Sequence, residues 1–81
     1  MKAFITKYAL TDGILEFEGE IAGDGMFRYR RSAEHYEEFA HGEGKDWHIT
    51  RESAVSRALE MRIAKLKSLD KQISRISAIK F

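Results

Sequence analysis

Residues 55–76, VSRALEMRIAKLKSLDKQISRI, carry apolar side chains at alternating spacings of four and three residues. This spacing places the apolar side chains on one narrow stripe of a long helix, and such a stripe needs a second helix to cover it. We call this stripe the seam. Its residues are Val55, Leu59, Leu66, Leu69, Ile73 and Ile76, with Arg62 as the single break. Because the seam extends over about three heptads, it predicts a coiled coil.

The sequence contains no helix-breaking residue between Arg51 and about Ala78. Thr50 is placed to cap the N-terminus of this helix, and Glu52 puts a negative charge in the first turn, where it suits the helix dipole. A helix of this length measures about 42 Å, whereas a compact chain of this size is about 30 Å across. We therefore expect the helix to extend beyond the rest of the domain. Its first turns are expected to pack on a sheet through Ala54, Val55, Ala58, Leu59 and Met61.

Two interpretations of the seam stay open. With Leu59, Leu66 and Ile73 at heptad position a, a second copy of the chain would cover the seam, and the protein would be a homodimer. In a parallel pair, Lys65 of one copy would meet Asp70 of the other. The alternative is a helix that packs along its whole length on its own sheet. The direction of pairing also stays open.

The first fifty residues predict a small antiparallel sheet. Residues 2–8, 14–21 and 26–31 alternate between apolar and polar side chains, which is typical of half-buried strands. Gly23-Asp24-Gly25 is a natural hairpin loop between the second and third of these strands. A loop of three residues places four pairs opposite one another: Ile21 and Phe27, Gly19 and Tyr29, Glu20 and Arg28, and Glu18 and Arg30.

Residues 39–41 and 45–49 suggest a second small hairpin around Gly42-Glu43-Gly44. Trp47 is expected to anchor the core there, because a large aromatic side chain dominates a small core. The predicted fold class is α+β: an antiparallel sheet of three to five strands (residues 1–49) and one long helix (residues 50–79), in a single domain covering residues 1–81.

The composition limits the classes of protein to which the chain can belong. With 81 residues and no cysteine, the chain has no disulfides, and domains this small often need a partner to be stable. No apolar run approaches the length of a membrane span, and no signal-peptide pattern begins the chain. We expect a soluble cytoplasmic protein that binds no membrane.

The charges divide unevenly along the chain. Residues 1–50 hold 6 Lys and Arg against 10 Asp and Glu, a net charge of −4, and residues 51–81 hold 8 against 3, a net charge of +5. An acidic part followed by a basic helix can attract an anionic partner or a neighbouring copy of the chain.

Two charged faces are candidate binding surfaces for a partner. Lys67, Lys71 and Arg75 are spaced by four on one side of the helix, where they could bind nucleic-acid phosphate or an acidic protein. The alternative is a solvated helix face. The second face is the acidic face of the hairpin, formed by Glu16, Glu18 and Glu20. It could imitate nucleic acid and so bind a protein whose nucleic-acid-binding surface is basic.

The densest cluster of unusual residues is the segment 41–48, HGEGKDWH. Its His41 and His48, with Glu43 and Asp46, are potential zinc ligands or acid–base groups, but their spacing matches no ligand pattern. Besides a metal or catalytic site, the segment could be a structural turn or a loop that binds a partner. A structural turn is the favoured interpretation. We predict no cofactor, no metal and no catalytic residue, hence a protein that is not an enzyme.

The aromatic side chains could stack on the bases of single-stranded nucleic acid, or they could pack in the core of the domain. The core is the favoured interpretation, because glutamates on the open side of the sheet would repel phosphate. The residues concerned are Phe4, Tyr8, Phe27, Tyr29, Tyr36 and Phe39.

Three segments carry a resemblance: MKAFITKYALTDGI (1–14), HGEGKDWHITRESA (41–54) and KLKSLDKQI (65–73), with the final phenylalanine. Together they resemble small bacterial proteins of the kind carried by phages and other mobile elements, to which no activity is assigned. The resemblance covers most of the chain except residues 20–38. It implies a small accessory protein that binds a target stoichiometrically, such as an anti-CRISPR inhibitor of host defence.

From these observations we expect a non-enzymatic protein-binding module, an inhibitor or adaptor that acts by occlusion as a homodimer on a protein target of unknown identity. The alternative is an accessory protein that binds nucleic acid through the basic face of the helix.

Overall fold

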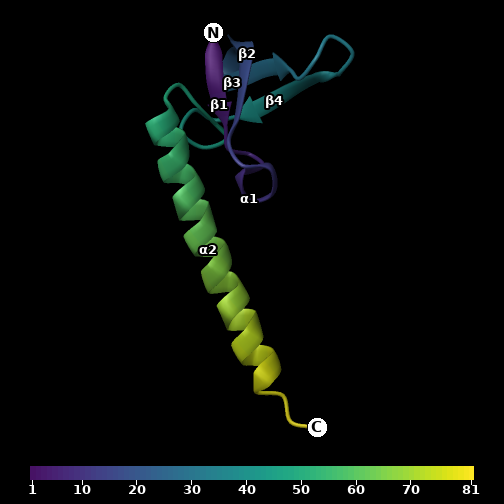
Figure 1. Ribbon diagram of the computed structural model, residues 1–81, viewed down its shortest axis with the longest axis vertical. Coiled ribbons are helices and arrows are strands. Elements are labelled where there is room, and N and C mark those ends of the chain that lie inside the picture. The colour runs from purple at the N-terminus through teal and green to yellow at the C-terminus, as the bar shows by residue number, and fades with distance from the viewer.

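Five antiparallel strands and one long helix form the computed structural model, which describes residues 1–81 (Figure 1). This confirms the predicted α+β fold. The strands are β1 (Lys2–Ile5), β2 (Leu15–Ala22), β3 (Met26–Arg30), β4 (Glu37–His41) and β5 (Trp47–His48). The other elements are the short helix α1 (Ala9–Asp12), the 3₁₀ turn η1 (Gly23–Gly25) and the long helix α2 (Arg51–Ser77).

The strands lie in the order β4-β3-β2-β1-β5, and β2 connects the two halves of this sheet. The first half of β2 pairs with β1 and its second half pairs with β3. The predicted hairpin register is confirmed for three pairs: Gly19 with Tyr29, Glu20 with Arg28, and Ile21 with Phe27.

Gly19 lies where the pairing of β2 changes from β1 to β3. Its N–H donates to the carbonyl of Met1 at 2.9 Å, while its other neighbour is β3. A Cβ atom built on Gly19 would overlap the carbonyl oxygen of Arg28 and lie 2.8 Å from the Phe27 ring. Only glycine therefore lets the two strands approach this closely.

We expect Gly19→Ala to lower the free energy of unfolding by about 1–3 kcal/mol, the usual cost of overpacking. Urea denaturation followed by circular dichroism measures this change. Gly23→Ala is the matched control, because a Cβ there meets no atom within 4 Å. Equal effects of the two substitutions would show that close strand packing at Gly19 is unimportant.

The predicted second hairpin is wrong. β4 pairs with β3 and β5 pairs with β1, so the two short strands lie at opposite edges of the sheet. The segment between them is a tight turn in which Gly42 and Gly44 have positive φ angles. The N–H groups of Lys45 and Asp46 both donate to the carbonyl of Gly42. These hydrogen bonds close the turn on itself instead of building a two-stranded ladder.

The core lies inside this curved sheet. Trp47 comes from the edge strand β5, yet its ring stacks on Phe27 of β3 at a centroid distance of 5.4 Å. Its Nε1–H donates to the carbonyl of Gly25 at 2.8 Å. Trp47 is therefore the predicted core anchor, and it ties the edge strand β5 to β3 and to η1. The buried core residues are Ala3, Ile5, Phe27, Tyr29, Ala40 and Trp47.

The interpretation of the aromatic residues as core is confirmed for Phe27 and Tyr29. It is wrong for Tyr36, which is 92% exposed in the connection between β3 and β4. Burial, and then the nearby Glu38 carboxylate, raises the pKa of Tyr29 to about 12. Phe39 on the edge strand β4 is also exposed.

The first strand is shorter than predicted and ends at Ile5. The side chain of Thr6 turns into the interior and its Oγ1–H donates to the carbonyl of Lys45 at 2.8 Å. The chain then forms α1, a single turn that the alternating pattern of residues 2–8 did not indicate. α1 lies beside α2 (Figure 1).

Helix α2 begins as predicted. Thr50 caps it by accepting a hydrogen bond from the N–H of Ser53 at 3.2 Å, and Glu52 lies in the first turn. The helix leaves the sheet and gives the molecule a long axis of 54 Å, against 28 Å and 21 Å in the other directions. The expectation that α2 extends beyond the sheet is confirmed (Figure 1).

The face of α2 that contacts the body differs from the prediction. Ala54 is its only buried residue, and Ala58 and Met61 are half-buried on the same side. Val55 and Leu59, which we expected to pack on the sheet, are exposed. Each lies one position after an alanine of the packed face and therefore points about 100° away around the helix.

Candidate interaction surface on helix α2

The whole seam is exposed in the single chain. Its six side chains range from 38% exposed at Val55 to 66% at Ile76. From Arg62 to the end of the chain every residue is exposed. The interpretation in which α2 packs along its whole length on its own sheet is therefore wrong.

Sequence reasoning missed one residue of this surface, Ile63, which is half exposed. It follows Leu59 by four positions and precedes Leu66 by three, so it lies on the same side of the helix. Ile63 therefore continues the apolar surface past Arg62, the break in the strict heptad pattern. The i, i+4 spacing from Leu59 was the signal that could have found it.

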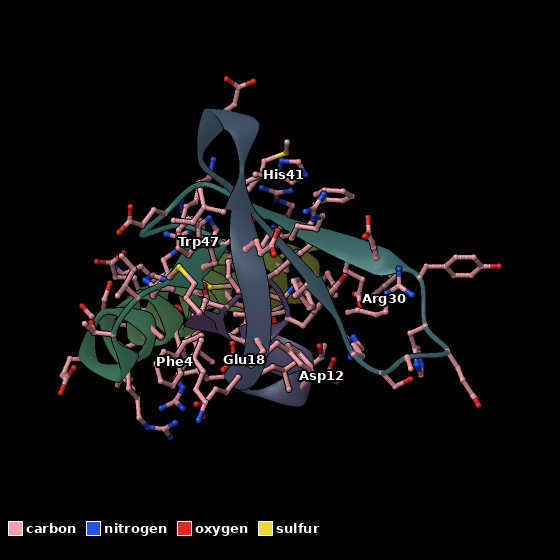
Figure 2. The ribbon with its side chains drawn as sticks, turned by 90° about the horizontal axis from the view of Figure 1, so that it is seen from above. Phe4, Asp12, Glu18, Arg30, His41 and Trp47 are labelled. Carbon is pink, nitrogen blue, oxygen red and sulfur yellow. The ribbon has the colours of Figure 1, made fainter.

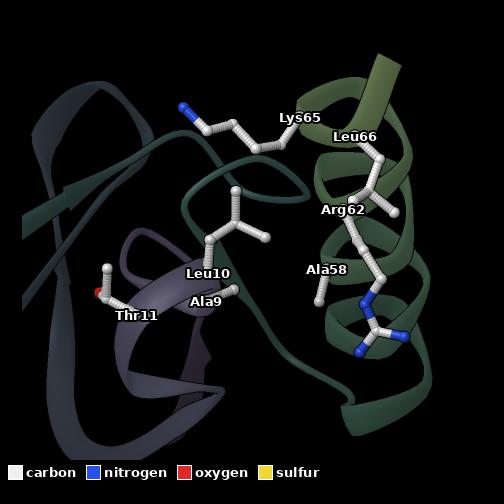
Figure 3. Close-up of a pocket in the computed structure, with 7 residues that line it drawn as sticks. All are labelled: Ala9, Leu10, Thr11, Ala58, Arg62, Lys65 and Leu66. Carbon is white, nitrogen blue, oxygen red and sulfur yellow. The ribbon is translucent and has the colours of Figure 1, made fainter. Parts of the chain in front are cut away.

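A groove of about 560 Å³ lies between α1 and α2 (Figure 3). Leu10 of α1 stands between the two helices. Leu66 of α2 belongs both to the groove and to the seam, and Arg62, the break in the seam, also lines the groove. The groove thus extends the apolar surface from α2 onto the body of the protein. Its lining consists of Ala9, Leu10, Thr11, Ala58, Arg62, Lys65 and Leu66.

The predicted basic face is present on α2. Lys67, Lys71 and Arg75 are all exposed and none has an ion-pair partner. The one ion pair within α2 joins Arg57 to Glu60 at 3.6 Å, near the start of the helix. Like charges spaced by four on a helix repel one another, so a counter-charged partner would stabilise this face.

The acidic face of the sheet is largely compensated by neighbouring cations. Glu16 lies 3.9 Å from Lys2, Glu18 lies 3.3 Å from the N-terminal amine, and Glu20 lies 2.8 Å from Arg28. Exposed pairs of this kind add little stability, but they weaken the negative potential that imitation of nucleic acid would require.

The predicted pairing of Glu18 with Arg30 is wrong, and Figure 2 shows the two side chains apart. Arg30 instead lies 3.6 Å from Glu37 of β4. The reason is that the ladder between β2 and β3 ends at the pair Gly19 and Tyr29, before Glu18 can face Arg30.

The structure separates the two histidines of the segment 41–48. His41 is exposed on β4, whereas His48 is 1% exposed on β5. No three His, Asp or Glu side chains lie close enough together to hold a metal ion. The geometry of the segment is that of a structural turn, with the hydrogen bonds to Gly42 described above.

A buried hydrogen-bonded chain runs through His48. Because Thr6 Oγ1 donates to a carbonyl, it accepts from His48 Nε2–H at 3.0 Å. His48 Nδ1 then accepts from the hydroxyl of Ser53 at 2.7 Å. These hydrogen bonds join Thr6, the residue after β1, to β5 and to the first turn of α2. A serine and a histidine in this geometry resemble a nucleophile and its base, but no carboxylate orients this imidazole. Both ring nitrogens of His48 are engaged in hydrogen bonds that fasten α2 to the sheet.

Burial lowers the pKa of His48 below the ordinary value of a histidine. Neutral His48 therefore stabilises the folded state fully above the unfolded pKa of about 6.5. We expect this stability to be lost as the pH falls below that value through the lowered folded pKa. Thermal denaturation between pH 7.5 and 5 measures the effect.

His48→Gln should remove this part of the pH dependence, whereas the control His41→Gln should retain it because His41 is exposed. A pH dependence that is the same in both variants would exclude His48 as its source.

No helix combines the length and the apolar character that crossing a membrane requires.

Comparisons of this chain with protein-family models, with curated proteins and with solved structures find no match.

Proposed function

We propose that this protein is a non-enzymatic protein-binding module that acts as a homodimer joined through the seam of α2. The observation that supports this is the bare C-terminal part of α2: from Arg62 to Ser77 the helix has an apolar stripe and no cover. Isolated helices of about 12–15 residues are marginal in water, because most helical stability in proteins comes from packing. A second chain would supply that packing.

The best occupant of the seam is a second copy of the same chain. The apolar side chains repeat at heptad spacing, as in helices that pack against a like partner. The net charges of −4 and +5 on the two parts of the chain are also complementary between copies. A two-fold interface uses the same patch on both subunits and needs no other component.

The homodimer would present two copies of the sheet to a target. We propose an inhibitor or adaptor that acts by occlusion, the role implied by the resemblance to accessory proteins of phages and mobile elements. Imitation of nucleic acid by Glu16, Glu18 and Glu20 is the weaker form of this proposal, because a cation lies within 4 Å of each carboxylate.

Light scattering on the intact protein at several concentrations tests the homodimer. The chain mass is 9.4 kDa, so the proposal expects a particle of twice that mass. A particle of single-chain mass at every concentration, with circular dichroism showing α2 fully formed, would contradict it.

The unpaired basic face supports a second candidate function, binding of nucleic acid by Lys67, Lys71 and Arg75. Three phosphate contacts would give a logarithmic salt dependence of affinity with a slope of about −3. Reversing these three charges should abolish retardation of DNA or RNA at low salt, whereas reversing Lys2, Lys7 and Lys45 of the sheet part should not. The absence of any retardation by the unmodified protein would exclude this candidate.

A further inference from the structure

We infer that the two α2 helices of the homodimer run antiparallel, so that the C-terminal turns of each copy lie against the groove between α1 and α2 of the other. This inference rests on the proposed homodimer and adds its geometry. It follows from the charge distribution, from the place of Arg62 and from the groove itself.

The charges on either side of Met61 are opposite. Residues 1–61 hold 8 Lys and Arg against 12 Asp and Glu, a net charge of −4, and residues 62–81 hold 6 against 1, a net charge of +5. Parallel pairing would bring two segments of +5 side by side at a distance of about 8–10 Å. Charges at that distance are only partly screened at physiological salt. In an antiparallel pair with Leu66 opposite Leu69, residues 62–73 of the two copies still face each other. The last turns, with Arg75 and Lys80, instead lie beside residues 54–61 of the other copy, which hold one Arg and one Glu and carry no net charge.

Arg62 occupies heptad position d of the seam. In a parallel pair position d faces position d, so two Arg62 guanidinium groups would meet in the apolar interface. In an antiparallel pair position d faces position a. With Leu66 opposite Leu69, Arg62 faces Ile73 of the other copy and lies near its Asp70, a counter-charge.

One contact favours the parallel arrangement, the pair between Lys65 and Asp70 described above. This pair would lie at the exposed edge of the coiled coil, where ion pairs contribute little. Two like charges enclosed in the interface are far more unfavourable. The place of Arg62 therefore outweighs the pair formed by Lys65.

The same antiparallel register fills the groove. It places Ile76 of one copy opposite Leu59 of the other and Ser77 level with Ala58. Ile79, two residues beyond the end of α2, then continues towards Leu10 of the groove. Leu10, Ile76 and Ile79 are all exposed in the single chain. Parallel pairing would leave the groove open, because the C-terminal turns would then cover only each other. Antiparallel pairing covers both apolar surfaces at once.

The chain has no cysteine, so a single introduced cysteine can carry a nitroxide label. In the antiparallel register Ser77 lies level with residue 58 of the other copy, which separates two Ser77→Cys labels by about 28 Å along the axis. A parallel pair would hold the same labels side by side, under about 20 Å apart. The matched control is Ser68→Cys, near the centre of the register, which gives a short distance in either arrangement.

Pulsed electron paramagnetic resonance measures these distances, and light scattering on the same labelled samples gives the mass. A dimer with a long Ser77 distance and a short Ser68 distance supports the inference. A dimer in which both distances are short overturns it and leaves the proposed homodimer intact. A monomer overturns the proposed homodimer and the inference with it.

Discussion

Replacing Leu66 and Ile73 by aspartate is expected to convert the proposed homodimer into a monomer and to unfold the C-terminal half of α2. Each change removes an aliphatic side chain from the interface, which costs about 2–5 kcal/mol at a well-packed site. Each copy also brings two carboxylates into the interface. Since about 1.4 kcal/mol is a factor of ten in affinity, the dissociation constant of the dimer should rise by at least about a thousandfold. Light scattering measures the mass, and far-ultraviolet circular dichroism measures the loss of helix.

The matched control is the double variant Ser68→Asp, Ser74→Asp. It adds the same two charges to the same stretch of α2, but at positions outside the seam. We expect this control to remain a dimer with unchanged helix content. If the seam variant stayed a folded dimer, or if the control dissociated equally, the seam could not be the assembly surface.

The sequence alone predicted those features that depend on local periodicity. The heptad spacing identified α2, and the side chain of Thr50 identified its first residue. The alternation of residues 14–21 and 26–31, with a loop of fixed length, determined the hairpin register, because a shift by one residue would turn every side chain to the other face. These features depend mainly on neighbouring residues. The one predicted pair that fails, Glu18 with Arg30, fails because β2 pairs with β1 from Glu18 backwards.

The edges of the sheet could not be predicted in this way. β4 and β5 are short, and their pattern does not say which strand each of them pairs with. For β5, the contacts that accompany this pairing are those of Trp47. Its ring stacks on Phe27 and its Nε1–H donates to Gly25, and both residues lie twenty or more positions away in the sequence. Likewise, the role of His48 follows from its contacts with Thr6 and Ser53, and Thr6 comes from the far end of the chain.

The candidate surface was only partly predictable. The spacing showed which side chains of α2 share a face, but not which face contacts the sheet. The structure places Ala54 against the body, and therefore turns Val55 and Leu59 outward. Neither Leu10 nor the groove could be found from the sequence, because α1 gave no periodic signal. The predicted seam thus became one part of a wider apolar surface.

Trp47→Ala is expected to unfold the sheet. Its indole is almost completely buried, stacks on Phe27 and donates to the carbonyl of Gly25. Removing a buried large aromatic side chain costs about 3–5 kcal/mol, a large part of the 5–15 kcal/mol that holds a typical domain together. The substitution also leaves the Gly25 carbonyl without its partner. Urea denaturation followed by circular dichroism measures the loss, since no other tryptophan provides a fluorescence signal.

Two further variants show why Trp47 matters. Trp47→Phe keeps a stacking ring but loses the hydrogen bond to Gly25, so its cost should be smaller than that of Trp47→Ala. Tyr36→Ala removes an aromatic side chain that is exposed to solvent, and such a change should shift stability by no more than about 0.5 kcal/mol. If Trp47→Ala were as mild as Tyr36→Ala, then the sheet would be held closed without Trp47. Because β5 is only two residues long, its ladder with β1 is short, and hydrogen bonds between Thr6 and residues 45, 46 and 48 reinforce it. The indole is the largest apolar group that holds this edge on the core, so its loss should cost more than the loss of any one of these hydrogen bonds.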